Sequence, residues 1–261
     1  MLITHATQAA PDVDRNEDSV VTGPDFAVVL DGATAAPEVD TGCIHDVPWL
    51  VARLGAELAY VLLTESQRLV DALGRAIEGV MAQHEDTCDL GNPDSPSSTV
   101  AIVRDRGGSV DYLALSDSPI VLRRIDGSID VVHDNRNDFL PGYTVEIVRQ
   151  QRNAPGGFWV ASTKPEAATE ALTGSIPRDS IDCAGLFTDG AARLAERHGL
   201  GWADLIELLA QNGPAAVVDR VRREDERLAG HRPGKAHDDA TAVLCRFDGP
   251  IRSGRHPDWR S

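Results

Sequence analysis

The order in which strand-like and helix-like segments follow one another constrains the fold of this chain most strongly. Two short apolar runs lie near residues 19–30, and helical patterns near 48–63 and 67–84 follow them. A run of β-type segments, separated by Asp-Gly and other turn signals, then spans about 97–133. Closely spaced segments of this kind are typical of an antiparallel meander, because parallel neighbours need a long crossover between them.

Helical patterns return in the second half of the chain, and DDATAVLCRF at 238–247 closes it as a predicted strand. Between them, GGFWVAS (156–162) favours a strand, and EAATEALTG (166–174) favours a short helix that ends at glycine. This order predicts an α+β fold in which antiparallel sheets pack in layers against helices. No change of composition marks a linker, so we expect one domain over 1–248 and a tail over 249–261.

The composition limits the classes of partner. The 261 residues carry a formal net charge of −16, which argues against a nucleic-acid-binding protein and against attachment to an anionic membrane surface. An acidic chain can still handle an anionic substrate if bound metal supplies local positive charge. No apolar run looks long enough to span a bilayer, and the N-terminus lacks the pattern of a secretory signal. We therefore expect a cytoplasmic protein.

The four cysteines, Cys43, Cys88, Cys183 and Cys245, are widely scattered and form no CxxC pair. The sequence predicts free thiols, several of them buried, because disulfides are rare in a reducing compartment. The histidines do not stand at the spacing of common zinc sites. A zinc site is therefore not expected.

Carboxylates recur at the ends of predicted strands. Any one of them is usually a turn former, but strand ends of one sheet system can converge at an edge. Hard divalent cations such as Mg²⁺ and Mn²⁺ prefer carboxylate, carbonyl and water oxygens, and Gly32 and Gly190 allow the backbone to approach closely. The pattern therefore predicts a divalent-cation site. The acids are Glu17, Asp18, Asp31, Asp117, Asp189, Asp238 and Asp239.

Six short motifs in order resemble those of the metal-dependent PPM family of protein serine/threonine phosphatases, the type 2C phosphatases. The resemblance spans about residues 3–247 and implies a four-layer α-β-β-α sandwich, with two central antiparallel sheets flanked by helix pairs. The motifs are NEDS (16–19), VVLDGAT (28–34), SSTVAIV (97–103), LALSDSPIVL (113–122), LFTDGAARL (186–194) and DDATAVLCRF (238–247).

The resemblance also implies roles for the metal ligands. Asp31 would bridge two Mn²⁺ or Mg²⁺ ions, and Gly32 would offer its carbonyl oxygen to one of them. Asp189 and Asp238 would complete the ligand set of the other ion. Asp117 matches the acid that is associated with a third, weaker metal. Two cations at such a site can activate a water and neutralise the oxygens of a transferring phosphoryl group.

Among the residues expected to take part in catalysis, Glu17 and Asp18 would hold metal-bound waters. Family members commonly carry a phosphate-binding arginine at the position that Val13 occupies here. We expect Arg15 to replace it, because an arginine two residues from Glu17 in an extended strand lies on the same face. The alternative is that Arg15 forms a surface ion pair.

Other departures leave further alternatives open. Arg232 and Lys235 precede Asp238 and can supply a cation, or they belong to a flexible polar loop. Ala33 stands where some members carry a general-acid histidine. His45 can protonate a leaving alkoxide or can serve as a structural histidine at a helix N-terminus.

The leading functional hypothesis is a metal-dependent phosphatase that hydrolyses phosphoserine and phosphothreonine in proteins. A phosphorylated protein or peptide is then the expected partner. One alternative is a phosphatase of a small phosphorylated metabolite. Another is a regulatory binding module with the same fold and weak catalysis, which the absence of arginine at position 13 favours and the retained acids disfavour.

Overall fold

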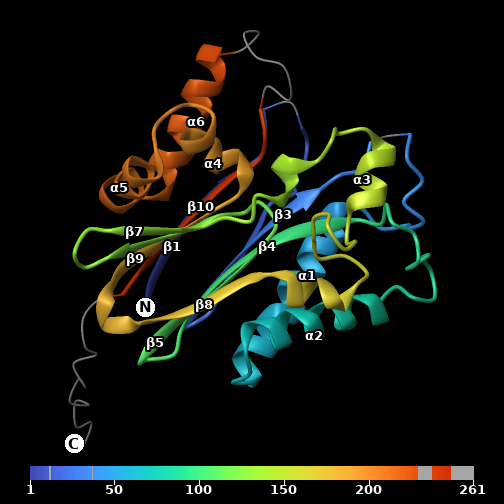
Figure 1. The fold of residues 1–261 in the computed structure, drawn as a ribbon, viewed down its shortest axis with the longest axis horizontal. Coiled ribbons are helices and arrows are strands. Elements are labelled where there is room, and N and C mark those ends of the chain that lie inside the picture. Colours follow the sequence, from blue (N-terminus) through green and yellow to red (C-terminus); the bar gives the residue numbers. More distant parts are fainter. Residues whose placement is uncertain (12, 37, 229–236, 248–261) are drawn as a thin grey trace, which may run out of the picture.

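Two five-stranded antiparallel sheets form the centre of the molecule, and helices cover the outer face of each (Figure 1). The computed structural model describes residues 1–11, 13–36, 38–228 and 237–247. Every strand pair within the sheets is antiparallel, which confirms the predicted α+β four-layer sandwich. The predicted tail at 249–261 lies outside the described residues.

Each sheet combines strands from distant parts of the chain. The first sheet runs in the order β2 (Ser19–Thr22), β3 (Phe26–Ala33), β4 (Ser97–Asp105), β5 (Ser109–Leu115) and β8 (Leu172–Pro177). The second sheet runs in the order β1 (Leu2–Gln8), β10 (Ala240–Arg246), β9 (Ile181–Phe187), β6 (Ile120–Arg124) and β7 (Ile129–Val132).

Strand β3 shows why the apolar run FAVVL is continuous. Successive side chains of a strand point to opposite faces, so Phe26, Val28 and Leu30 pack toward the helices, and Ala27 and Val29 pack between the two sheets. A strand that is buried on both faces needs apolar residues at every position. The same alternation directs the next side chain, at position 31, toward the layer between the sheets.

Helices α1 (Val47–Thr64) and α2 (Leu69–Ala82) cover the first sheet and match the predicted pair. Asp46 caps α1 by accepting a hydrogen bond from the Trp49 N–H at 2.9 Å. By length and composition α1, with a mean hydropathy of 1.3, is long enough to cross a membrane, which the sequence analysis did not predict. In the fold α1 buries Leu50, Leu54 and Leu58 against the sheet, as a core helix does.

Three helices cover the second sheet, in the second half of the chain, where the sequence shows helical patterns. They are α4 (Asp189–Glu196), α5 (Trp202–Asn212) and α6 (Pro214–Leu228). The third helix is present because Asp189–Glu196, which follows β9 directly, buries Ala191, Ala192 and Leu194 in the same core as α5 and α6. Figure 1 shows these helices on one side of the sandwich and α1 and α2 on the other.

Two local predictions were wrong. Residues 156–162 form isolated bridges, Arg152 with Phe158 and Ser98 with Ala161, but no strand. Residues 166–174 divide between a 3₁₀ helix at Pro165–Glu170 and the start of β8. The polar segment before them contains a short 3₁₀ turn, Arg136–Phe139, and helix α3 (Val145–Gln151). Residues 172–177 form strand β8 because they pair with β5, and a local pattern does not show which distant segment a strand will pair with.

Candidate active site

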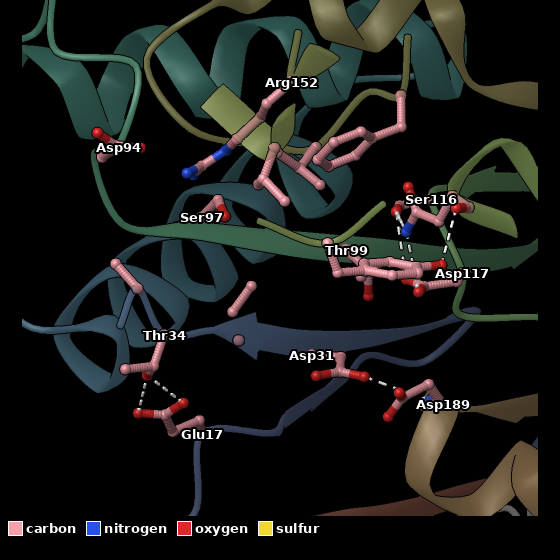
Figure 2. Close-up of a pocket in the computed structure, with 18 of the residues that line it drawn as sticks. Glu17, Asp31, Thr34, Asp94, Ser97, Thr99, Ser116, Asp117, Arg152 and Asp189 are labelled. Atoms are coloured by element: carbon pink, nitrogen blue, oxygen red, sulfur yellow. Dashed lines mark hydrogen bonds between the residues drawn. The ribbon is translucent and has the colours of Figure 1, made fainter. Parts of the chain in front are cut away.

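The acids at the ends of β3, β9 and β10 meet at one end of the sandwich. Asp31 lies near the end of strand β3. Asp189 begins α4 directly after β9, and Asp238 lies two residues before β10. The Asp31 carboxylate accepts a hydrogen bond from the Asp189 backbone N–H at 3.2 Å (Figure 2). Because β3 belongs to one sheet and β9 and β10 to the other, the site lies where the layer between the sheets opens.

A pocket of about 470 Å³ opens at this end, and it contains most of the predicted site residues. Helix α3 lies beside the same end of the sandwich (Figure 1). One wall is acidic, and Val145, Val148, Phe158 and Val160 form an apolar part of the lining. The predicted residues that line the pocket are Glu17, Asp31, Gly32, Asp117, Asp189 and Asp238.

Two glycines permit the close approach of the chain segments around the acids. A Cβ atom on Gly190 would lie 1.8 Å from the backbone oxygen of Asp239, which is too close for any side chain at position 190. A Cβ atom on Gly32 would lie 2.3 Å from Val47 and 2.7 Å from the backbone oxygen of Glu17. Both positions therefore require glycine for packing, as the Asp-Gly pairs of the sequence suggest.

Burial and mutual repulsion raise the pKa values of Asp31 and Asp189 above their ordinary range. Desolvation raises the pKa of Asp31 well above its usual value, and the neighbouring charges of Asp18, Asp189, Asp117 and Asp238 raise it further. Desolvation, with the charges of Asp238 and Asp117, raises the pKa of Asp189 to about 6. Clustered carboxylates of this kind are unfavourable when all are ionised.

Asp18 lies beneath the pocket and does not line it. One of its oxygens accepts hydrogen bonds from the hydroxyls of Thr241 at 2.6 Å and Thr188 at 3.0 Å, whereas Oδ1 is buried without a partner. Desolvation raises the pKa of Asp18 to about 8 although both hydroxyls oppose the shift. A buried acceptor without a donor, beside an acidic cluster of oxygen donors, fits a site for hard divalent cations.

Ser116, Asp134 and Asn137 hold the segment around Asp117. Ser116 has a φ of +66°, and the Asp134 carboxylate accepts its backbone N–H at 3.2 Å. Asn137 donates to Asp117 at 3.0 Å and to the Ser116 hydroxyl at 3.2 Å. These contacts hold Ser116 in the left-handed conformation that glycine adopts without strain.

Arg15 does not lie at the pocket. Its guanidinium forms an ion pair with Asp46, the residue that caps α1, and about 65% of its side chain is exposed. The extended-strand argument failed because β2 begins only at Ser19, so Arg15 and Glu17 do not share a strand face. The surface ion pair, which was the alternative, is the arrangement found.

Arg152 is the only cation that lines the pocket among the residues described. It follows α3 directly, and its guanidinium donates to the backbone oxygen of Ser95. Figure 2 shows Arg152 above Ser97, across the pocket from Glu17 and Asp31. Residues 135–154 contain no motif, so no local pattern points to Arg152.

The other open alternatives concern His45, Arg232 and Lys235. His45 lies outside the pocket, near Cys43, Cys88 and Trp49. Arg232 and Lys235 lie outside the described residues. On the side of β10, Arg193 donates to Asp238 at 3.2 Å and contacts the buried Asp225. Arg193 thus compensates part of the charge of Asp238.

A family model described as protein phosphatase 2C matches residues 4–222 of this chain. The chain belongs to the protein phosphatase 2C family. The match contains the motifs around Glu17, Asp31, Asp117 and Asp189, and it ends before Asp238. No curated protein sequence matches the chain significantly.

Solved structures share the protein phosphatase 2C fold of this chain. The serine/threonine phosphatase PstP/Ppp of Mycobacterium tuberculosis is 18% identical, with a TM-score of 0.60 over 93% of this chain and 97% of that one. The catalytic domain of PstP with two manganese ions is 17% identical, with a TM-score of 0.59 over 93% and 96%. The phosphatase MsPP of Mycobacterium smegmatis, in complex with cacodylate, is 18% identical, with a TM-score of 0.58 over 94% and 97%.

Proposed function

We propose that this protein is a phosphatase that uses two divalent cations, Mn²⁺ or Mg²⁺, to hydrolyse phosphoserine and phosphothreonine in proteins. The observation that carries the proposal is the convergence of Asp31, Asp189 and Asp238 at one pocket, where burial and neighbouring acids raise the pKa of Asp31 and Asp189. The family supports it, and the PstP structure contains two manganese ions.

The residues that would hold the cations are Asp31, the Gly32 carbonyl, Asp189 and Asp238. Asp117 would contribute to a third, weaker site. The bound cations supply the positive charge that activates a water and neutralises phosphoryl oxygens. The hydrogen bond from the Asp189 N–H, at 3.2 Å, orients the Asp31 carboxylate toward the other acids.

Glu17 and Asp18 would then orient waters and accept protons around that cluster. The hydroxyl of Thr34 donates to the Glu17 carboxylate, which keeps this acid on the pocket wall (Figure 2). Asp18 acts from below, where its Oδ1 has no donor.

Arg152 is the group that we assign to the substrate phosphate. It supplies a positive, forked donor set on the wall opposite the acids, and such a fork binds phosphate through paired, charge-assisted hydrogen bonds. Beside it, Tyr143 and Val145 are exposed at the pocket, and Phe139 is exposed nearby on the same 3₁₀ turn as Asn137. Apolar side chains around a phosphate site favour a peptide chain over a small polar metabolite.

The deciding experiment compares phosphopeptides, small phosphorylated metabolites and p-nitrophenyl phosphate with Mn²⁺, with Mg²⁺ and without metal. We expect metal-dependent hydrolysis, with the highest kcat/KM for phosphopeptides. Asp31→Asn should lower kcat by about 100-fold or more, because a neutral amide is a poor bridge between cations.

The alternatives give different results. A metabolite phosphatase would show its highest kcat/KM on a small substrate and little on any peptide. A binding module would bind phosphopeptides, and the wild-type protein would hydrolyse none of the substrates faster than Asp31→Asn does.

A further inference from the structure

Four metal-ligating side chains come together away from the phosphatase pocket. Cys43 and His45 precede α1, and His84 and Cys88 follow α2. One potential ligand atom from each of the four lies within 4.8 Å of the others. His84 is buried, and the other three are half-buried. None of these residues lines the pocket that contains Asp31.

The distances between the donor atoms match a tetrahedral nitrogen and sulfur site. The Cys43 sulfur lies 3.7 Å from Nδ1 of His45 and 3.6 Å from Nδ1 of His84, and the Cys88 sulfur lies 3.5 Å from Nδ1 of His45. Four such ligands around Zn²⁺ stand about 3.3–3.8 Å apart, given the usual zinc–sulfur and zinc–nitrogen bond lengths. The two sulfurs are closer, at 3.0 Å, and would separate by about 0.8 Å around a metal.

The topology explains why these four residues meet. Helices α1 and α2 form an antiparallel hairpin, so the beginning of α1 and the end of α2 lie at the same end (Figure 1). Each loop contributes one mixed half-site, Cys-x-His before the hairpin and His-x₃-Cys after it. Because each half-site mixes a cysteine with a histidine, a search for CxxC or for paired histidines misses both.

The surroundings of the four side chains hold them in place. The ring of Trp49 stacks on His45, with centroids 3.9 Å apart and an angle of 19°, and lies 5.2 Å from the ring of His84. The two loops also cross-link through their backbones: Asp89 N–H donates to the Gly42 oxygen at 2.8 Å. Apolar cover and fixed ligand orientation are features of closed structural metal sites.

We propose that Cys43, His45, His84 and Cys88 bind one structural Zn²⁺ ion. A tetrahedral set of two sulfurs and two imidazole nitrogens favours zinc over the hard cations of the phosphatase pocket. This corrects the expectation from sequence that the chain has no zinc site. The proposal does not depend on the phosphatase function.

The ion would fasten two loops that both continue to the phosphatase pocket. The loop before Cys43 contains Thr34 and Val39, and the segment after Cys88 contains Asp94 and Ser97; all four line the pocket. The zinc ion would therefore fix the ends of the α1–α2 hairpin and, through them, two parts of the pocket rim.

The first test is the metal content of the full-length protein, purified without chelators. We expect about one zinc per chain, and the same content in Asp31→Asn/Asp189→Asn, in which the phosphatase pocket is disabled. An organomercurial that modifies thiols should release this zinc, whereas zinc held only by carboxylates would stay bound. Substitution by Co²⁺ should give sulfur-to-metal charge-transfer bands and the intense visible bands of a tetrahedral site.

Variants test the ligands. Cys88→Ser and His45→Ala should lose the zinc and lower Tm by about 5 °C or more. Cys183→Ser is the matched control: this cysteine is buried in the core beneath α5, and its replacement should lower stability without loss of zinc. Because a ligand variant can fail to fold, the Co²⁺ spectrum of the wild-type chain provides an independent result.

Three results would overturn the proposal. One is a zinc content near zero together with a Co²⁺ spectrum that lacks sulfur charge-transfer bands. Another is a Cys43–Cys88 disulfide in the purified protein, which peptide mass spectrometry under non-reducing conditions would reveal. The third is zinc that Cys88→Ser retains and Asp31→Asn/Asp189→Asn loses, which would place the ion in the phosphatase pocket.

Discussion

Asp239 accepts a hydrogen bond from the backbone N–H of Glu17 at 2.6 Å, although 222 positions separate them in the sequence. Its other oxygen accepts the Ala10 N–H at 2.8 Å. One carboxylate thus fastens the segment that carries Glu17 to the beginning of β10, next to Asp238. Asp239 is therefore a positioning residue: it holds two parts of the candidate site in register and does not line the pocket itself.

Asp239→Ala should lower the free energy of unfolding by about 1–3 kcal/mol, because two N–H groups lose a charged acceptor. It should also weaken Mn²⁺ binding, since Glu17 and Asp238 lose their common support. Asp239→Asn keeps one acceptor oxygen and should fall between the wild type and alanine. Calorimetric titration with Mn²⁺ and denaturant unfolding measure both effects. Equal Mn²⁺ affinity in all three proteins would show that Asp239 has no positioning role.

Arg152→Ala should raise KM for a phosphopeptide by about tenfold or more and change kcat little, because a charge-assisted contact to the bound phosphate is lost. Arg152→Lys should restore only part of the affinity, since lysine lacks the forked donor set. The matched control is Arg15→Ala, which removes an exposed arginine paired with Asp46 and should leave kcat/KM near the wild-type value. A larger effect at Arg15 than at Arg152 would return the phosphate role to Arg15.

The metal-free protein should lose stability as the pH rises. The folded-state pKa of Asp18, about 8, lies above its ordinary value of 3.8, so the folded state binds this proton more tightly than the unfolded state does. The contribution is fully present below about pH 4 and disappears as the pH rises toward 8. Asp31 and Asp189, whose pKa values are also raised, act in the same direction.

Asp18→Asn isolates this effect. Asparagine can still accept the hydroxyls of Thr188 and Thr241 but carries no charge, so the metal-free variant should gain Tm over the wild type between about pH 5 and 8. Thermal unfolding in chelator across this range measures the difference. A constant difference in Tm from pH 5 to 8 would show that Asp18 does not titrate there. With Mn²⁺ the order should reverse, because the variant has lost a site carboxylate.

Gly190→Ala should disturb the site through the backbone. The added methyl would lie 1.8 Å from the Asp239 oxygen, so the segment that carries Asp238 and Asp239 must move. We expect a loss of at least about 2 kcal/mol in stability, as for other overpacked positions, and weaker Mn²⁺ binding. Gly108→Ala is the control, because no atom lies within 4 Å of its added methyl. Wild-type stability and Mn²⁺ affinity in Gly190→Ala would contradict the close approach.

Local sequence patterns predicted helices α1 and α2 and the acids that meet at the pocket. The helical spacing of apolar residues over 48–63 and 67–84 predicted α1 and α2 to within a few residues. It could do so because the residues that form the apolar face of one helix all lie within one short segment. The Asp-Gly pairs gave Asp31 and Asp189, since glycine is required where backbone passes within contact distance. An acid followed by glycine at the end of a strand is a local signal, which can be recognised without knowing which other segments pack against it.

The tertiary structure decided which residues share a site when no local pattern connects them. Arg15 was assigned to the pocket because a strand was assumed to include it, whereas that segment precedes β2 and the arginine pairs with Asp46. Arg152 enters the pocket only because α3 folds over it. Cys43, His45, His84 and Cys88 meet because a hairpin of two helices brings its ends together. Such contacts form only when helices, strands and loops pack against one another. The interactions that stabilise this packing join residues far apart in the sequence, so no local pattern contains them.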